Sequence, residues 1–333
     1  MTVTLSRTGM DMSDDVRPIP PGLLERVAAS AAGIGPVDRL GAEVEQLRTR
    51  EQSTVLEYRF EGGLRLIAKR YAQSRDALAS FEVLRLLRAE GFGSASPHRV
   101  AEPLGCFDEW GVLVSRAVPG HRLRTLVAQP EHWEAGLRAA AGWLAQLHAV
   151  SVDLGAREDM AQGVFQLARR AARAGAHHPE LERTLVQLIE ELAQRGLSLP
   201  GSQSQTQTHG RYHTGHVYVA PDSVSVIDLD RIALADPAKD VGEFLHRLRA
   251  QARWARLGED AADRAALAFL AEYAARAHAV PAGLVYYWSY SVLSTLLRLL
   301  ELDRARWEKR LKFFRAEFED LPQRASTLTG LAL

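Results

Sequence analysis

Residues 209–230, HGRYHTGHVYVAPDSVSVIDLD, decide how the rest of the chain is interpreted. A polar loop leads into two short apolar runs, and the Pro221-Asp222 pair between them is typical of a tight turn. The stretch therefore predicts a β-hairpin whose second strand ends at Asp228, with Asp230 two positions later. Carboxylates at a strand end are oxygen ligands of the kind that Mg²⁺ uses. The alternative is that they cap the next turn.

Three histidines, His209, His213 and His216, lie within eight residues of this loop. Imidazole clusters bind zinc and other transition metals, so one hypothesis is a transition-metal hydrolase that uses them with Asp228 or Asp230. The spacing H-x₃-H-x₂-H matches no standard zinc site. The alternative is that the three rings hydrogen-bond to the loop backbone.

The chain after residue 119 is mainly helical in pattern. Asp236-Pro237 indicates a helix start, with Asp236 as N-cap and Pro237 at the first helical position. Asp240, one turn further on, can interact with the helix N-terminus or brace the loop before it. An apolar stripe from Trp133 to Leu147 predicts one helix. Apolar spacing predicts others near 158–175, 179–196, 238–255, 260–278, 282–301 and 303–319.

The chain before residue 119 is mainly β in pattern. Strand-like runs at 43–49, 54–60 and 64–71 predict a three-stranded antiparallel meander, because turn residues separate them. A helix at 74–90 and two strands at 99–107 and 110–118 follow. Residues 1–20 are expected to be a mobile tail and 21–32 a short amphipathic helix. The sequence thus predicts an α+β, two-lobed protein, with a β-rich lobe at 21–118 and a helical lobe at 119–333.

Composition narrows the class of protein. The 333 residues are 47% hydrophobic and 25% charged, which is typical of a soluble globular protein. Lys and Arg total 41 and so do Asp and Glu, which disfavours a general nucleic-acid binder. The uncharged run at 282–297 is shorter than the roughly 18 to 20 residues that cross a bilayer. We expect a cytoplasmic protein with no nucleic-acid or membrane partner, and its oligomeric state stays open.

Lysine is rare in this chain, which draws attention to Lys69 in the apolar run LIAKRY. Only four of the 41 basic residues are lysines. An ammonium is a compact point charge that suits a phosphate oxygen. The alternative is a strand-edge lysine with its head in water. Glu82, on the flank of the apolar face of the following helix, could orient the lysine or could be an ordinary surface residue.

Taken in order, these parts resemble the aminoglycoside phosphotransferase and choline kinase group, which has the protein-kinase-like fold. The resemblance spans roughly residues 36 to 320, and the order and spacing of its motifs make it specific. The matching parts are Lys69, Glu82, the hinge-like LVSRAVPG, LAQLHAV at a helix end, HGxxHxGHVYV, VIDLD and DPAKDVGEFL.

The resemblance implies ATP with Mg²⁺ or Mn²⁺ in a cleft between the lobes. Lys69 would contact the α- and β-phosphates, and Glu82 would hold that lysine. Ser115 and Ala117 of the hinge-like stretch would lie at the nucleotide.

The resemblance also assigns roles in the helical lobe. Asp228 would bind the metal, with Asp230 and His216 as further candidates. His209 would begin the catalytic loop, and Asp240 would steady it.

Two positions depart from the family pattern H-G-D-x-x-x-x-N. Arg211 stands where the aspartate positions the acceptor hydroxyl, and His216 stands where the asparagine binds metal. Arginine stays protonated and accepts no proton, and imidazole suits Mg²⁺ poorly. His213 is a candidate displaced base. In addition, LRTREQSTV has no glycine where the nucleotide-covering loop is expected.

Two functions follow from the resemblance. The first is a divergent small-molecule kinase that transfers the ATP γ-phosphoryl group to a hydroxyl of an unidentified acceptor. Phosphoryl transfer depends mostly on positioning and charge neutralisation, so loss of the base leaves room for a slow enzyme. The alternative is a pseudokinase, a binding or regulatory module in which Arg211 pairs with Asp228 and occupies the space of the metal.

Overall fold

The computed structural model describes residues 5–6, 42–50, 53–60, 62–199, 205–302 and 306–332. The chain divides into two compact units, Met1–Gly120 with Ser225–Asp230, and His121–Val224 with Arg231–Leu333. The sequence-based division placed the boundary two residues earlier, after residue 118, and left residues 225–230 in the helical lobe. Apart from residues 5–6, the expected tail at 1–20 and the helix at 21–32 lie outside the described residues.

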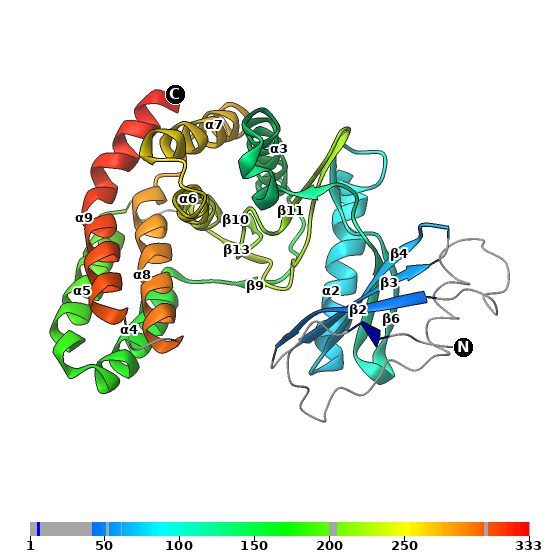
Figure 1. Ribbon diagram of the computed structural model, residues 1–333, viewed down its shortest axis with the longest axis horizontal. Helices are drawn as coiled ribbons and strands as arrows, with labels where there is room; N and C mark the ends of the chain where they lie inside the picture. Colours follow the sequence, from blue (N-terminus) through cyan, green and yellow to red (C-terminus); the bar gives the residue numbers. More distant parts are fainter. Residues whose placement is uncertain are drawn as a thin grey trace. The chain divides into compact units, whose positions relative to one another are not determined.

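The first unit is built on a six-stranded sheet in the order β1-β2-β3-β4-β7-β6. Figure 1 labels β2, β3, β4 and β6 of this sheet. From β2 to β6 each neighbouring pair is antiparallel, which includes the expected meander of β2, β3 and β4. The strands are β1 (Leu5–Ser6), β2 (Ala42–Arg50), β3 (Ser53–Phe60), β4 (Arg65–Tyr71), β6 (Pro103–Phe107) and β7 (Val112–Arg116).

Alternation along β4 separates the two faces of this sheet. Leu66 and Ala68 are fully buried in a core with Val112 and Val114. Because side chains alternate along a strand, Lys69 lies on the opposite face. Helix α2 (Ser74–Leu87) contacts β4, β6 and β7.

The second half of the first unit differs in detail from the sequence prediction. The expected strand 99–107 is two strands, β5 (His98–Val100) and β6, broken just before Pro103, which has no N–H for a ladder. The helix expected at 74–90 gives way to a π-helical turn, η1 (Arg88–Phe92), in which Gly91 has φ 97°. A 3₁₀ turn, η2 (Asp108–Trp110), precedes β7.

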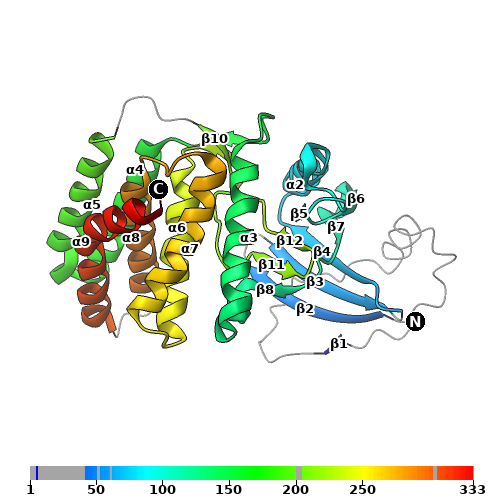
Figure 2. The ribbon, with the colours of Figure 1, turned by 90° about the horizontal axis from the view of Figure 1, so that it is seen from above.

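The second unit is mainly helical, as predicted, and its helices pack on one another in pairs (Figure 2). The pairs include α3 with α7, α6 with α8, and α8 with α9. The helices are α3 (Pro130–His148), α4 (Met160–His177), α5 (Glu182–Leu197), α6 (Ala238–Trp254), α7 (Glu259–Ala277), α8 (Leu284–Leu302) and α9 (Trp307–Ala332), with 3₁₀ turns η3 (Leu123–Ala128) and η4 (Pro179–Leu181).

Helix α9 is longer than the predicted 303–319 and runs on to Ala332. Its buried stripe continues beyond the predicted end through Leu321, Ala325 and Leu328. Within the described residues, no helix is long and apolar enough to span a membrane.

Short strands complete the second unit. β10 (Thr206–Thr208), β13 (Ala233–Ala235) and β9 (Ala156–Arg157) form one small sheet, and β8 (His121–Arg122) pairs with β11 (Val217–Ala220). β12 (Ser223–Val226) follows β11 after a turn at residues 221–222, as the hairpin prediction required. β12 begins in the second unit and ends in the first.

Candidate active site

A lysine and two aspartates meet in the first unit. The Nζ atom of Lys69 lies 3.1 Å from Oδ1 of Asp228 and also forms an ion pair with Asp230. Only 12% of the Lys69 side chain and 13% of the Asp228 side chain are exposed. Asp228 lies two residues beyond β12 with φ 67°, a left-handed conformation that aspartate tolerates better than most residues. The ammonium and the carboxylates singled out in the sequence are therefore in contact.

Two hydroxyl groups complete the surroundings of Asp230. The Tyr71 hydroxyl donates to Oδ1 of Asp230 at 2.9 Å, and the Ser80 hydroxyl donates to the same atom at 3.3 Å. Burial and then the charge of Asp230 raise the pKa of Tyr71, so the phenol keeps its proton. Lys69 Nζ also lies 4.9 Å from the centre of the Tyr71 ring. Sequence reasoning missed both residues, although Tyr71 shares a strand face with Lys69.

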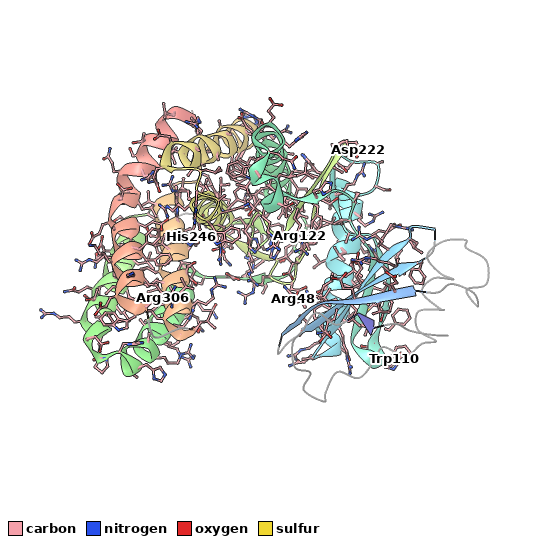
Figure 3. The ribbon with its side chains drawn as sticks, viewed as in Figure 1. Arg48, Trp110, Arg122, Asp222, His246 and Arg306 are labelled. Atoms are coloured by element: carbon pink, nitrogen blue, oxygen red, sulfur yellow. The ribbon has the colours of Figure 1, made fainter. Side chains whose placement is uncertain are left out.

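Arg48 is a second cation at Asp228 that the sequence did not reveal (labelled in Figure 3). Its Nη1 lies 3.4 Å from Oδ2 of Asp228. The β2–β3 register shifts between Gln46 and Arg48, so that Leu47 is an extra residue and Arg48 lies opposite Val55. Val55 in turn lies opposite Lys69. Since paired residues of neighbouring strands share a face, Arg48 and Lys69 lie in one row.

The structure does not bring Glu82 to Lys69, in contrast to the role that the resemblance implied. Glu82 accepts a hydrogen bond of 2.9 Å from Nε of Arg85, one turn further along α2. Its charge also adds to the effects of burial and of Asp108 in raising the pKa of Cys106 on β6. Asp228 and Asp230 are the carboxylates that contact Lys69.

The hinge-like residues are part of the sheet. Ser115 lies on β7, nearly buried, opposite Ile67 of β4. The N–H of Ala117 donates to the carbonyl of Arg65 at 3.0 Å. The N–H of Ala117 is therefore already engaged within the sheet.

In the second unit, Asp240 organises the start of the candidate catalytic loop. Its carboxylate accepts the N–H groups of His209 at 2.6 Å and Gly210 at 2.9 Å. His148 Nε2 lies 3.3 Å from the same carboxylate, and His148 Nδ1 lies 2.7 Å from the hydroxyl of Tyr273. Burial alone would raise the pKa of Asp240, but hydrogen bonding and charge from His148 outweigh it and lower that pKa. Asp240 therefore braces the loop, one of the two roles expected for it.

Gly210 allows a close backbone contact in the loop, and Asp236 caps the start of α6. Gly210 has φ 75°, and a Cβ atom there would lie 2.1 Å from the carbonyl oxygen of Arg231, so glycine is required. Asp236 caps α6 as expected, through a 2.7 Å hydrogen bond from the N–H of Ala238. The helix itself begins at Ala238, the first residue of the predicted range 238–255, and Pro237 lies immediately before it.

The remaining loop residues are packed against one another. The rings of His213 and His216 are 3.8 Å apart, and Nδ1 of His216 donates to the carbonyl of Arg211 at 3.1 Å. The N–H of Gly215 donates to Nδ1 of His213. Burial, and then the charges of His216 and Arg247, lower the pKa of His213 to about 2. A general base works best with a pKa near the working pH, so this value argues against His213 as a displaced base.

The three histidines of the loop, His209, His213 and His216, pack ring against ring. His209 is fully buried, with its ring 5.6 Å from the rings of Tyr212 and His216. Within the described ranges, no group of three or more His, Cys, Asp or Glu residues is placed to hold a metal ion. The transition-metal hydrolase hypothesis gains no support from this geometry.

Comparisons with known proteins bear on the family and the fold of the chain. Residues 50–284 match the model of the phosphotransferase enzyme family, abbreviated APH. A search of curated proteins finds no match.

Among solved structures, one similar chain is an aminoglycoside-3'-phosphotransferase of type VIII, at 22% identity and a TM-score of 0.55, with 83% of this chain and 97% of that chain covered. Another is an amicoumacin kinase in complex with AMP-PNP, Ca²⁺ and Ami, at 16% identity and a TM-score of 0.58. The match covers 91% of this chain and 94% of that chain. A third is a choline kinase from Cryptosporidium parvum Iowa II, at 12% identity and a TM-score of 0.61. The match covers 92% of this chain and 96% of that chain. At these identities the likeness shows a shared fold.

Proposed function

The chain belongs to the phosphotransferase enzyme family, and we propose that it transfers the γ-phosphoryl group of ATP to a hydroxyl group of a small molecule. The observation that carries this proposal is the contact of Lys69 with Asp228 and Asp230. An ammonium suits a phosphate oxygen, and two neighbouring carboxylates suit a hard divalent cation. The AMP-PNP and Ca²⁺ in the amicoumacin kinase complex support a nucleotide and a divalent cation as ligands.

The residues at this site fit that chemistry. In the proposal, Lys69 binds phosphate oxygens, and Asp228 and Asp230 hold Mg²⁺ or Mn²⁺. The metal would neutralise charge on the phosphates. Tyr71 and Ser80 orient Asp230 through their hydroxyl groups. His216 is a weaker candidate ligand for Mg²⁺, because that ion prefers oxygen.

Arg211 in the candidate catalytic loop lowers the rate of phosphoryl transfer that we expect from this protein. Arg211 accepts no proton, so in this proposal its guanidinium neutralises charge on the transferred phosphoryl group. With no aspartate base present, the proton of the acceptor hydroxyl passes to an oxygen of the transferred phosphoryl group as the new O–P bond forms and ADP leaves. Because general-base catalysis contributes about 10²- to 10⁴-fold, we expect a slow kinase.

The test is turnover by the purified protein with ATP and Mg²⁺ or Mn²⁺. Acceptors would include aminoglycosides, macrolides and choline, with phosphorylated product detected by mass spectrometry. Lys69→Ala and Asp228→Asn should each abolish product formation. Absence of both ATP binding and turnover in the wild-type protein, with either metal, would contradict the proposal.

The alternative is a pseudokinase that binds nucleotide or a partner without transferring phosphate. Arg211 in the aspartate position and the low pKa of His213 favour it. Arg211→Asp separates the two: it should create or raise activity in a kinase loop and have no effect in a pure binding module. The predicted Arg211–Asp228 ion pair requires the two side chains within about 6 Å. A crystal structure in which the Arg211 and Asp228 side chains lie farther apart than this would exclude a pseudokinase in which Arg211 occupies the metal site.

A further inference from the structure

Arg48 lies in the segment where a glycine-rich loop would normally approach the phosphates. This segment, LRTREQSTV, contains no glycine. The structure supplies a guanidinium instead, on the sheet face that carries Lys69. Two strand spacings separate the two backbones by about 10 Å. Both side chains nevertheless reach one carboxylate, that of Asp228.

The contact of Arg48 with Asp228 is a weak one. Its 3.4 Å length exceeds the roughly 2.7 to 2.9 Å of a strong charge-assisted hydrogen bond. The Nε atom of Arg48 is buried and has no acceptor within the described part of the chain. An unsatisfied buried donor destabilises the conformation that contains it. A phosphate group, which accepts two parallel N–H bonds from a guanidinium, is a better partner.

We propose that Arg48 is a phosphate-binding residue that exchanges Asp228 for the phosphates of a nucleotide when the nucleotide binds. The inference rests on the proposed function and deepens it. Before exchange, the two carboxylates at the site face two protein cations, Lys69 and Arg48, with which a divalent cation must compete. After exchange, Asp228 loses one of these cations. Nucleotide binding therefore strengthens metal binding through Arg48.

This exchange predicts that one substitution changes two affinities in opposite directions. In Arg48→Ala, the affinity for ADP in EDTA should fall about tenfold, the typical effect of losing one charged hydrogen bond. The affinity for Mn²⁺ without nucleotide should rise about threefold to tenfold, because Asp228 loses a competing cation. Calorimetry measures the first affinity, and electron paramagnetic resonance of free Mn²⁺ measures the second, both on the full chain.

Two further variants control this experiment. Arg48→Lys keeps the charge and should lie between wild type and Arg48→Ala in both measurements. Arg75→Ala removes the same charge from α2 of the same unit, where the side chain is 81% exposed, and should change neither affinity. Circular dichroism and thermal unfolding confirm that each variant is folded.

The outcomes separate the two proposals. If the wild-type protein binds ADP and both affinities of Arg48→Ala stay within about twofold of it, the inference falls and the kinase proposal stands. Loss of both affinities together, or loss of ADP binding without a gain in Mn²⁺ binding, also overturns the exchange. If the wild-type protein binds no ADP with or without metal, both proposals fall.

Discussion

His213 shows how one half-buried ring can make stability depend on pH. Its folded-state pKa of about 2 lies far below the ordinary 6.5. The unfolded chain therefore binds a proton below pH 6.5 that the folded chain does not. The stability that this neutral ring contributes is fully present above pH 6.5 and is lost as the pH falls from 6.5 toward 2.

The prediction concerns the substitution His213→Asn. Between pH 7 and pH 5 the wild-type free energy of unfolding should fall by about 2 kcal/mol more than that of the variant. Urea unfolding at a series of pH values measures the difference. Equal pH slopes for the two proteins would show that His213 titrates normally when folded.

Asp240 is the residue whose loss should most damage the loop. Asp240→Asn places an amide against the N–H groups of His209 and Gly210, which need an acceptor. Breaking a buried charged network of this kind typically costs about 3 to 5 kcal/mol, which urea unfolding at pH 7 would detect.

The pH dependence of Asp240 gives a second check. Its folded pKa is lowered from the ordinary 3.8, so its contribution is present above pH 3.8 and is lost as the pH falls below that value. The stability difference between wild type and Asp240→Asn should shrink in that range. A difference that stays constant down to pH 2 would contradict the assignment.

The site residues differ in how visible they are in the sequence. Lys69 stands out because lysine is rare, and Asp228 because it ends an apolar run. Arg48 could not be found, because its place beside Lys69 depends on the extra residue Leu47 in β2, and a β-bulge leaves no clear mark in a polar strand. Glu82 was assigned by family position, whereas α2 directs it to Arg85.

At the scale of elements, the close contact of α6 with α8 depends on Gly242. A Cβ atom at this position would lie 2.6 Å from the backbone nitrogen of Trp288. No side chain can move aside to relieve a clash with backbone, so the helices themselves must shift.

We therefore predict opposite effects for two Gly→Ala substitutions in helices. Gly242→Ala should destabilise the protein by about 2 kcal/mol or more, as overpacking does. Gly330→Ala in α9 has open space around its Cβ and should stabilise it by about 0.5 to 1 kcal/mol. Thermal and urea unfolding measure both. A Gly242→Ala protein as stable as wild type would show that α6 and α8 separate at little cost.

Elements were predictable in proportion to their length. The helices of 14 or more residues carry several turns of apolar spacing, and each was expected. Strands β8, β9, β10 and β13 have only two or three residues, too few for any periodic pattern, and they were missed. The break before β6 could have been found, since Pro103 cannot donate to a ladder.

At the scale of the whole molecule, the first unit is assembled from two separate parts of the chain. Residues 225–230 cluster with Met1–Gly120, while the residues on either side of them belong to the second unit. This six-residue segment, 225–230, which we call the return segment, contains Asp228 and Asp230, the two carboxylates that contact Lys69. A boundary drawn once along the sequence, near residue 119, could not express this arrangement.

A fragment of residues 1–120 should therefore be an incomplete unit. It keeps Lys69 but lacks both carboxylates that contact it. We predict that amide hydrogens of β4 exchange at least about tenfold faster in the fragment than in the full chain, because local opening becomes easier. Hydrogen exchange with mass spectrometry measures this. Equal protection would show that the return segment contributes nothing to the first unit.

The late position of the return segment, residues 225–230, in the sequence affects the order of events during synthesis. A ribosome makes about 5 to 20 residues per second, so Asp228 emerges about 5 to 20 s after residue 120. Throughout that interval the nascent chain contains Lys69 and Arg48 but not the carboxylates that contact them in the folded protein. The pairing of Lys69 and Arg48 with Asp228 is thus a late event in translation.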